Sequence, residues 1–232
     1  MVIYAMATHE IDAAKAQLAL CIRMLEQQGT LDYNGHCSIR IADDRLLINV
    51  GTAQRSTITA EDICTIDLSG QVIEGSGKPP LEFHLHSGLY RARTDVGAIV
   101  HAHPRWSTYL TMTATPYLPM FAQGSLLYPV PVLDTPNSIN TPDMADQLAQ
   151  TLGDGPAVLM KSHGAAVVGT DIIAAFVLAT YLEENAERQF MAQQLGAPYA
   201  FTIEEMAACR AKLFNPTLFQ RTWDHFAAKV AA

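Results

Sequence analysis

The sequence has few features of proteins that span membranes, bind nucleic acids or depend on disulfides. It contains no run of eighteen apolar residues, so we expect no membrane span. Its 15 Lys and Arg residues form no basic cluster and are outnumbered by 23 Asp and Glu residues, which argues against nucleic-acid binding. The four cysteines are scattered, without a Cys-x-x-Cys pair, and no basic segment followed by an apolar block begins the chain. We therefore expect reduced thiols and a cytoplasmic location.

Charged residues are also scarce in this chain. They make up 16% of its 232 residues, whereas hydrophobic residues make up 49%. Such a composition predicts a sizeable core and a surface that other subunits partly cover. No internal repeat or linker divides the chain, so we expect a single domain over residues 1–232.

The hydrophobic pattern predicts an α/β chain in which helices are mixed with antiparallel hairpins. The spacing predicts helices over residues 8–28, 82–92, 105–110, 141–152, 171–195 and 203–214. Alternating or short buried runs predict strands over 37–41, 45–50, 63–68, 71–73, 120–122, 130–132, 157–160 and 165–169. A further strand ends at His103. This order predicts a central mixed or antiparallel sheet.

Two histidines at the end of an apolar strand are the centre of the functional hypothesis. Residues 96–100 are largely apolar, and His101 and His103 follow them with one residue between. Strand periodicity puts these two side chains on one face, about 6.5–7 Å apart along the backbone. Pro104 ends the strand and can open the helix over 105–110. The pair can therefore close on one cation, although an isolated His-x-His is as often structural.

A third histidine and a glutamate strengthen this hypothesis. His163 follows another buried strand and precedes Gly164, and Glu82 begins a helix entered from a Gly/Pro-rich loop. Three imidazoles with a nearby carboxylate suit Zn²⁺, Mn²⁺, Fe²⁺ or Co²⁺. Three protein ligands also leave positions open for a substrate, as a catalytic metal requires.

The order of these motifs resembles the class II aldolase/adducin family. The match runs from the first helix to the long helix after His163. It rests on Glu82, His86, Tyr90, Arg91, Arg93 and Asp95, on Val100-His101-Ala102-His103-Pro104, and on Lys161-Ser162-His163-Gly164.

The resemblance implies a three-layer α/β/α fold with a largely antiparallel sheet. It also implies a homotetramer with active sites at subunit interfaces, a divalent metal such as Zn²⁺ or Mn²⁺ on His101, His103 and His163, and an acid/base role for Glu82. Adducins share the fold but lack this set of residues, which makes a metal-free scaffold the weaker alternative.

Departures from the aldolase pattern favour decarboxylation. The sugar-phosphate aldolases of this family bind phosphate through hydroxyl and amide donors at three dipeptides. Most of these donors are missing at the corresponding positions of this sequence. The corresponding positions read Gly35-His36, Val50-Gly51 and Pro80-Leu81. The Gly-His-x-Ser form resembles family members that decarboxylate hydroxylated aromatic or heteroaromatic acids. We therefore expect a metal-dependent decarboxylase of such an acid.

Several residues are candidates for binding the substrate or moving a proton, and other reactions remain open. The substrate-binding candidates are His36, His84, His86 and Arg40, and the candidate proton donors from a neighbouring subunit are Tyr117, Tyr128 and Tyr181. An aldolase for an unphosphorylated hydroxy-keto acid or sugar needs the same metal and glutamate. A non-haem iron oxygenase is a third possibility, because three histidines with open positions also suit Fe²⁺ and dioxygen.

Overall fold

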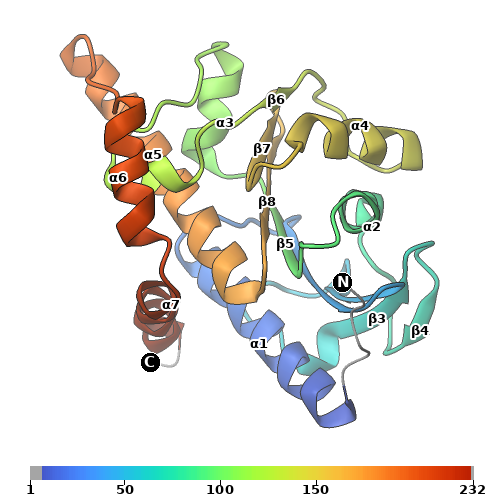
Figure 1. The fold of residues 1–232 in the computed structure, drawn as a ribbon. Coiled ribbons are helices and arrows are strands. Elements are labelled where there is room, and N and C mark those ends of the chain that lie inside the picture. Colours follow the sequence, from blue (N-terminus) through green and yellow to red (C-terminus); the bar gives the residue numbers. More distant parts are fainter. Residues whose placement is uncertain (1–6, 231–232) are drawn as a thin grey trace.

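The computed structural model describes residues 7–230, which form a sheet covered by helices (Figure 1). The strands are β1 (His36–Ala42), β2 (Arg45–Asn49), β3 (Ile63–Asp67), β4 (Val72–Glu74), β5 (Ala98–Ala102), β6 (Val132–Leu133), β7 (Ala157–Met160) and β8 (Gly164–Gly169). The helices are α1 (Thr8–Gln27), α2 (Phe83–Ala92), α3 (Arg105–Met112), α4 (Pro142–Leu152), α5 (Ile172–Leu195), α6 (Ile203–Leu213) and α7 (Pro216–Val230), with 3₁₀ turns η1 (Ala60–Asp62) and η2 (Ala122–Leu126).

The sheet is largely antiparallel, as predicted. Its strand order is β4-β3-β2-β1-β5-β8-β7-β6, and among these strands only β6 and β7 run parallel. The central strand β5 pairs with β1 on one side and with β8 on the other, so that His101 faces His36 across the sheet and Ala166 on the opposite side. The register therefore gathers polar side chains from distant segments.

Helices cover both faces of the sheet and give the three layers (Figure 1). Alternation along β5 sends Ala98 and Val100 into the core shared with α1 and α5. Ile99 points the other way, into the core shared with α2 and α4. His101 has the parity of Ile99 and so lies on the α2 side. The predicted α/β/α architecture is confirmed.

The predicted helices and hairpins are present, but one predicted strand is wrong. Residues 120–122 lead into the 3₁₀ turn η2 because the Asn185 side chain of α5 accepts hydrogen bonds from the Met120 and Phe121 backbone nitrogens at 2.9 and 3.0 Å. These two backbone donors therefore bond to a side chain, where in a strand they would bond to a neighbouring strand. The strand expected over 130–132 is reduced to β6.

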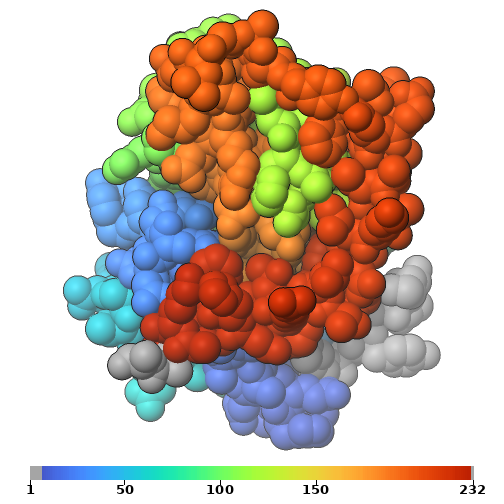
Figure 2. Space-filling model, turned by 90° about the vertical axis from the view of Figure 1, so that its left-hand side faces the viewer, coloured from blue at the N-terminus to red at the C-terminus, as the bar shows by residue number. Residues whose placement is uncertain are grey.

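A C-terminal helix, α7, was not predicted. Its Phe219 and Trp223 are buried against the α1–α5 side of the sheet, where Trp223 packs edge-on to Phe176. Figure 2 shows the orange and red residues of α6 and α7 spread over this face around the yellow-green segment that includes η2, against which α6 packs. The helical layer on this side is therefore thicker than the sequence predictions imply.

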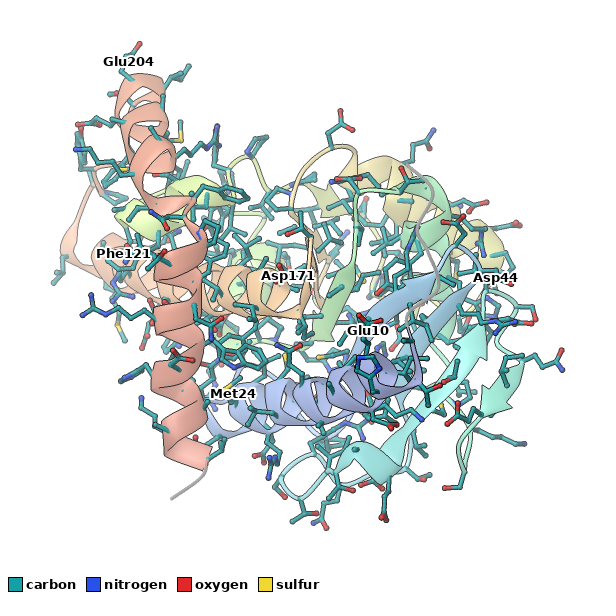
Figure 3. All side chains as sticks on the ribbon, turned by 60° about the horizontal axis from the view of Figure 1, so that its bottom comes forward. Glu10, Met24, Asp44, Phe121, Asp171 and Glu204 are labelled. Atoms are coloured by element: carbon teal, nitrogen blue, oxygen red, sulfur yellow. The ribbon has the colours of Figure 1, made fainter. Side chains whose placement is uncertain are left out.

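The long helix α5 begins where the sequence predicts. Asp171 caps it by accepting a hydrogen bond from the Ala174 nitrogen at 2.8 Å, and Figure 3 labels this residue at the start of the helix. All eight strands belong to one sheet, while a single domain over residues 1–232 stays a prediction. Among residues 7–230, we find no helix with the length and apolar character to cross a bilayer.

Candidate metal centre

His101 lies at the end of β5, buried between β1 and β8. Its Nδ1 is 3.0 Å from the Ala165 carbonyl oxygen. A carbonyl can only accept, so Nδ1 carries the proton and donates. The Nε2 atom therefore has a free lone pair, and it has no hydrogen-bond partner among the described residues. A buried, unpaired acceptor of this kind is what a metal ligand presents in a structure without the ion.

His103 is oriented by a carboxylate. Its Nδ1 donates to Oδ1 of Asp32, 2.9 Å away in the loop after α1. Asp32 also accepts backbone bonds from Asn34 and Gly35 at 3.1 and 2.9 Å. Burial raises the pKa of Asp32, but the hydrogen bonds from His103 and from the Gly35 and Asn34 backbone outweigh this effect and lower the pKa to about 2. The ionised carboxylate thus fixes the ring with Nε2 free.

His163 sits in the tight turn between β7 and β8. Its Nδ1 donates to the Asn137 carbonyl oxygen at 3.1 Å, and burial lowers the pKa of the ring, which favours the neutral form. The next residue must be glycine because a Cβ on Gly164 would lie 2.3 Å from the Ala102 carbonyl oxygen. The same Cβ would lie 3.1 Å from the His103 ring. This glycine therefore lets β8 approach β5 closely, which brings His163 near His103.

Glu82 reaches the centre from the residue before α2. Its Oε1 accepts a hydrogen bond from the Ile139 nitrogen at 2.8 Å and lies 3.7 Å from Nε2 of His163. Its Oε2 lies 3.6 Å from Nε2 of His101. Burial raises the pKa of Glu82, but interactions with His101 and His36 lower it by a larger amount. The pKa therefore lies below its ordinary value. The carboxyl group is ionised at neutral pH.

These side chains converge as a set that can hold a divalent metal. One ligand atom from each of Glu82, His101, His103 and His163 lies within 4.8 Å of the others. Small ring movements would bring such atoms to the metal–ligand distances of about 2.0–2.2 Å usual for imidazole and carboxylate. Because a second group holds each Nδ1, all three imidazoles present Nε2, the arrangement that orients metal-bound histidines. The donor chemistry therefore fits a divalent transition metal.

His36 joins this centre and is connected to a buried chain of hydrogen bonds. Its Nε2 lies 3.9 Å from Oε2 of Glu82, and its Nδ1 is 2.7 Å from Nε2 of His86. The other nitrogen of His86 is 2.6 Å from the Ser38 hydroxyl, which is 2.8 Å from the Tyr90 hydroxyl. Burial lowers the pKa of His36 to about 4, so its ring is neutral at pH 7.

A cavity of about 590 Å³ opens in front of the centre. Four of the predicted site residues line this cavity, namely His36, Glu82, His103 and His163. Sequence reasoning missed the rest of the polar wall, because those residues lie in loops with no recognisable motif. They are Asn34, Thr52, Arg55, Lys78, Ser138 and Asn140.

Three predicted substrate-binding residues do not line this cavity. His86 is buried behind His36, and His84 is half-buried with its ring tilted against that of Phe83. Arg40 is buried with its guanidinium 4.6 Å from the centre of the Tyr90 ring, and it donates to the backbone carbonyl of the same residue. These contacts direct Arg40 to the protein backbone, so the structure does not bring it to a substrate carboxylate.

The three candidate proton-donating tyrosines also lie away from the cavity of their own chain. The Tyr117 hydroxyl is buried and donates to the Gly124 carbonyl at 3.4 Å. The Tyr181 hydroxyl lies 3.2 Å from that of Thr222, and Tyr128 lines a separate hollow beside α4. Donation from a neighbouring subunit stays a prediction.

A cluster that could hold a divalent metal, at one end of a largely antiparallel sheet covered by helices, agrees with the resemblance to the class II aldolase/adducin family. The comparison with known families agrees. Residues 16–190 match the model of the class II aldolase and adducin N-terminal domain, and the chain belongs to this family.

Relatives of known activity include both decarboxylases and aldolases. The chain is 26% identical to 3,4-dihydroxyphthalate decarboxylase of Arthrobacter keyseri, over 94% of each chain. It is 28% identical to L-fuculose phosphate aldolase of Methanocaldococcus jannaschii, over 75% of this chain and 93% of that one. The solved L-fuculose 1-phosphate aldolase from Glaciozyma antarctica PI12 has a TM-score of 0.85 at 20% identity, covers 98% of this chain and 92% of its own, and shows the shared fold.

Proposed function

We propose that this protein is a divalent-metal-dependent carbon–carbon lyase that decarboxylates a small hydroxylated aromatic or heteroaromatic acid. The observation that carries the proposal is the convergence of Glu82, His101, His103 and His163, of which one ligand atom each lies within 4.8 Å of the others, with the neutral His36 beside them. The resemblance of the Gly35-His36 segment to decarboxylases supports it, as does the similarity to a dihydroxyphthalate decarboxylase. Zn²⁺ or Mn²⁺ is the proposed ion, with Fe²⁺ or Co²⁺ as alternatives.

In this proposal Glu82 carries the proton that the reaction needs. Its ionised carboxylate takes the proton of the substrate hydroxyl next to the reacting carboxylate. The bond to that carboxylate then breaks, carbon dioxide leaves, and the electron pair remains with the ring carbon. Glu82 returns the proton to this carbon, and the product phenolate takes a proton from water on release. A bound divalent cation would supply Lewis-acid stabilisation of the negative charge on the substrate oxygens.

His36 is the second candidate proton donor. If Tyr90 donates to Ser38, Ser38 donates to His86, and His86 donates to Nδ1 of His36, then Nε2 of His36 carries a proton toward the cavity. The chain of hydrogen bonds would hold this tautomer without charging the ring. His36 would then hydrogen-bond an anionic oxygen of the substrate or return the proton to carbon in place of Glu82.

The second candidate function is aldol cleavage of an unphosphorylated hydroxy-keto acid or sugar. It uses the same cluster and the same glutamate, and the similarity to an L-fuculose phosphate aldolase favours it. Metal-loaded protein incubated with candidate acids would release carbon dioxide in the first case and an aldehyde in the second. Oxygen uptake would instead indicate an iron oxygenase.

Two variants test the proposed roles of metal and glutamate. Glu82→Gln retains the three imidazoles, so we expect it to bind Mn²⁺ while its turnover falls by about 100-fold or more. His103→Ala removes a ligand and should lose metal and activity together. Metal content and carbon dioxide release are measured on the same preparations, with the exposed Glu61→Gln as the matched control. Near-normal turnover in Glu82→Gln would contradict the acid/base role.

We also propose a cytoplasmic homotetramer with its active sites between subunits. The low share of charged residues supports extensive subunit contacts. So does the exposure of large apolar side chains, among them Leu81, which is 84% exposed at the cavity rim.

A further inference from the structure

Arg55 is a buried cation on the wall of the metal cavity. Its side chain comes from the loop after β2 and is 3% exposed, yet the residue lines the same cavity as Glu82, His103 and His163. Burial lowers the pKa of its guanidinium, which nevertheless remains protonated at neutral pH because the ordinary value is so high. A buried charge is costly unless a counter-ion or strong hydrogen bonds compensate it.

The protein compensates this charge only in part. Within residues 7–230, no carboxylate oxygen lies within 4.0 Å of the Arg55 guanidinium. Asp32 is the carboxylate whose charge acts on the Arg55 guanidinium, and it already accepts a hydrogen bond from His103. Arg55 therefore has no ion-pair partner of its own in the described part of the chain.

Backbone carbonyls satisfy some of the Arg55 donors. Nε donates to the Gly35 carbonyl at 2.7 Å, and Nη1 donates to the Ala53 carbonyl. The contacts of Nη1 with Val50 and of Nη2 with Gly51 are long, at 3.5 and 3.4 Å. A guanidinium has five N–H donors, so one on Nη2 has no acceptor among the described residues. The group is held in place with hydrogen-bonding capacity to spare.

Lys78 adds a second cation to the same wall. It is exposed, lines the cavity, and has no hydrogen bond or ion pair from its side chain within the described ranges. Its backbone carbonyl accepts from the Gly51 nitrogen at 2.9 Å, which fastens its loop to the loop of Arg55. Glu82 is the one acidic residue among the described residues that line the cavity. Two positively charged side chains thus line this cavity in a protein of net charge −8, which favours an anionic ligand there.

We infer that Arg55 and Lys78 form an anion subsite for a second charged group of the substrate, remote from the bond that is cleaved. The inference rests on the proposed function and narrows its substrate to acids with a second anionic group, preferably a second carboxylate. Arg55 provides hydrogen bonds of fixed direction to that group, and Lys78 provides charge without fixed geometry. Phosphate shares this chemistry, so the test includes a phosphorylated compound.

The test compares two acids that differ by one carboxylate. The diacid 3,4-dihydroxyphthalate and the monoacid 2,3-dihydroxybenzoate have the same hydroxyl beside the same reacting carboxylate. With Mn²⁺-loaded wild-type protein, we expect kcat/KM for carbon dioxide release to be at least about tenfold higher for the diacid, because charge-assisted hydrogen bonds are strong. Dissociation constants measured by calorimetry should show the same preference, with or without turnover.

Variants assign this preference to the subsite. Arg55→Gln should reduce the ratio of the two kcat/KM values to near one, and Lys78→Gln should reduce it severalfold. Because the described residues make no hydrogen bond or ion pair with the Lys78 side chain, its variant keeps the test valid if Arg55→Gln fails to fold. Arg45→Gln, which removes an exposed arginine on β2, is the matched control and should keep the wild-type ratio. Mn²⁺ affinity is measured throughout.

The outcomes separate this inference from the proposed function. Carbon dioxide release without preference for the diacid, or a preference unchanged in both variants, would overturn the anion subsite and leave decarboxylation intact. Arg55-dependent binding of the diacid without release of carbon dioxide would support the subsite and contradict decarboxylation. An Arg55-dependent preference for L-fuculose 1-phosphate over L-fuculose would support the subsite with phosphate as its anion. An equal loss of binding for diacid and monoacid would show a purely structural arginine and contradict the inference.

Discussion

At the residue scale, the centre depends on partners that orient each histidine. The Ala165 and Asn137 carbonyls and the Asp32 carboxylate each hold one Nδ1, which leaves each Nε2 free. Of these three orienting groups, only the Asp32 carboxylate is charged. It differs from the carbonyls in that a single atom change, from carboxylate to amide, can remove its charge without altering its size.

Asp32→Asn should weaken metal binding by about 10- to 100-fold, because a carboxylate that accepts a hydrogen bond from a metal-binding histidine orients the ring and raises its basicity. Calorimetric titration of Mn²⁺ into wild-type and variant protein measures this. The exposed Asp44→Asn on the β1–β2 turn is the matched control. Equal affinities of wild type and Asp32→Asn would show that Asp32 does not act on the metal.

The same variant has a predictable dependence on pH. The pKa of Asp32 is lowered from 3.8 to about 2 on folding, so its stabilising contribution is fully present above pH 4. That contribution is lost as the pH falls toward 2. The stability difference between wild type and Asp32→Asn in urea should therefore shrink over this range, and a difference that grew would contradict the pairing with His103.

The sequence predicts much of the cluster but little of its support. Strand periodicity alone predicts His101 and His103 on one face, and in the structure one ligand atom of each lies within 4.8 Å of the other, while their role as metal ligands stays a prediction. Asp32 lies 71 residues from His103 in the chain, and no local pattern connects the two. Arg55 was equally hidden, because a polar loop after a strand is usually solvated. Contacts made through loops depend on the whole fold, and spacing does not encode them.

At the scale of elements, the close approach of β8 to β5 controls the geometry of the centre. Gly164→Ala would put a methyl group 2.3 Å from the Ala102 carbonyl oxygen. We expect it to lower the free energy of unfolding by about 1–3 kcal/mol, as overpacking does, and to weaken Mn²⁺ binding. Urea denaturation and metal titration measure the two effects.

Gly155→Ala is a suitable control for this prediction, because its nearest contact would be the Leu152 carbonyl at 3.2 Å. A smaller loss of stability and unchanged metal affinity are expected for it. Wild-type metal affinity in Gly164→Ala would show that the turn adapts without moving His163.

Elements were predictable where their pattern was local. The helices and hairpins that carry the site follow from periodicity, capping residues and turns. The missed helix α7 also carried a local signal, since Phe219, Trp223, Phe226 and Val230 recur at helical spacing after Pro216. Residues 120–122 carried a misleading local signal, which led to the wrong prediction of a strand. Their short apolar run has strand-like composition, but Asn185 of α5 supplies the hydrogen-bond acceptor that a strand would otherwise provide.

At the scale of the whole molecule, the centre joins segments that are far apart in the chain. Glu82 precedes α2, His101 is among the last residues of β5, His103 directly follows that strand, and His163 lies between β7 and β8. An ion bound to them would link the helix on one face of the sheet to three strand ends. The unfolded chain holds these groups apart, so the ion binds the folded state selectively and should stabilise all of it.

Mn²⁺ at 100 times its dissociation constant should therefore raise the free energy of unfolding by about 2.7 kcal/mol. For a chain of this length, this corresponds to a rise in Tm of roughly 5–10 °C. Thermal denaturation of chelator-treated protein, with and without Mn²⁺, measures the shift. It should decrease in acid, because protons compete with the metal for the imidazoles. His103→Ala should lose most of the shift, whereas the exposed variant His9→Ala should keep it. A shift of equal size in His103→Ala would mean that the ion acts elsewhere, and the convergence of the three rings would then need another explanation.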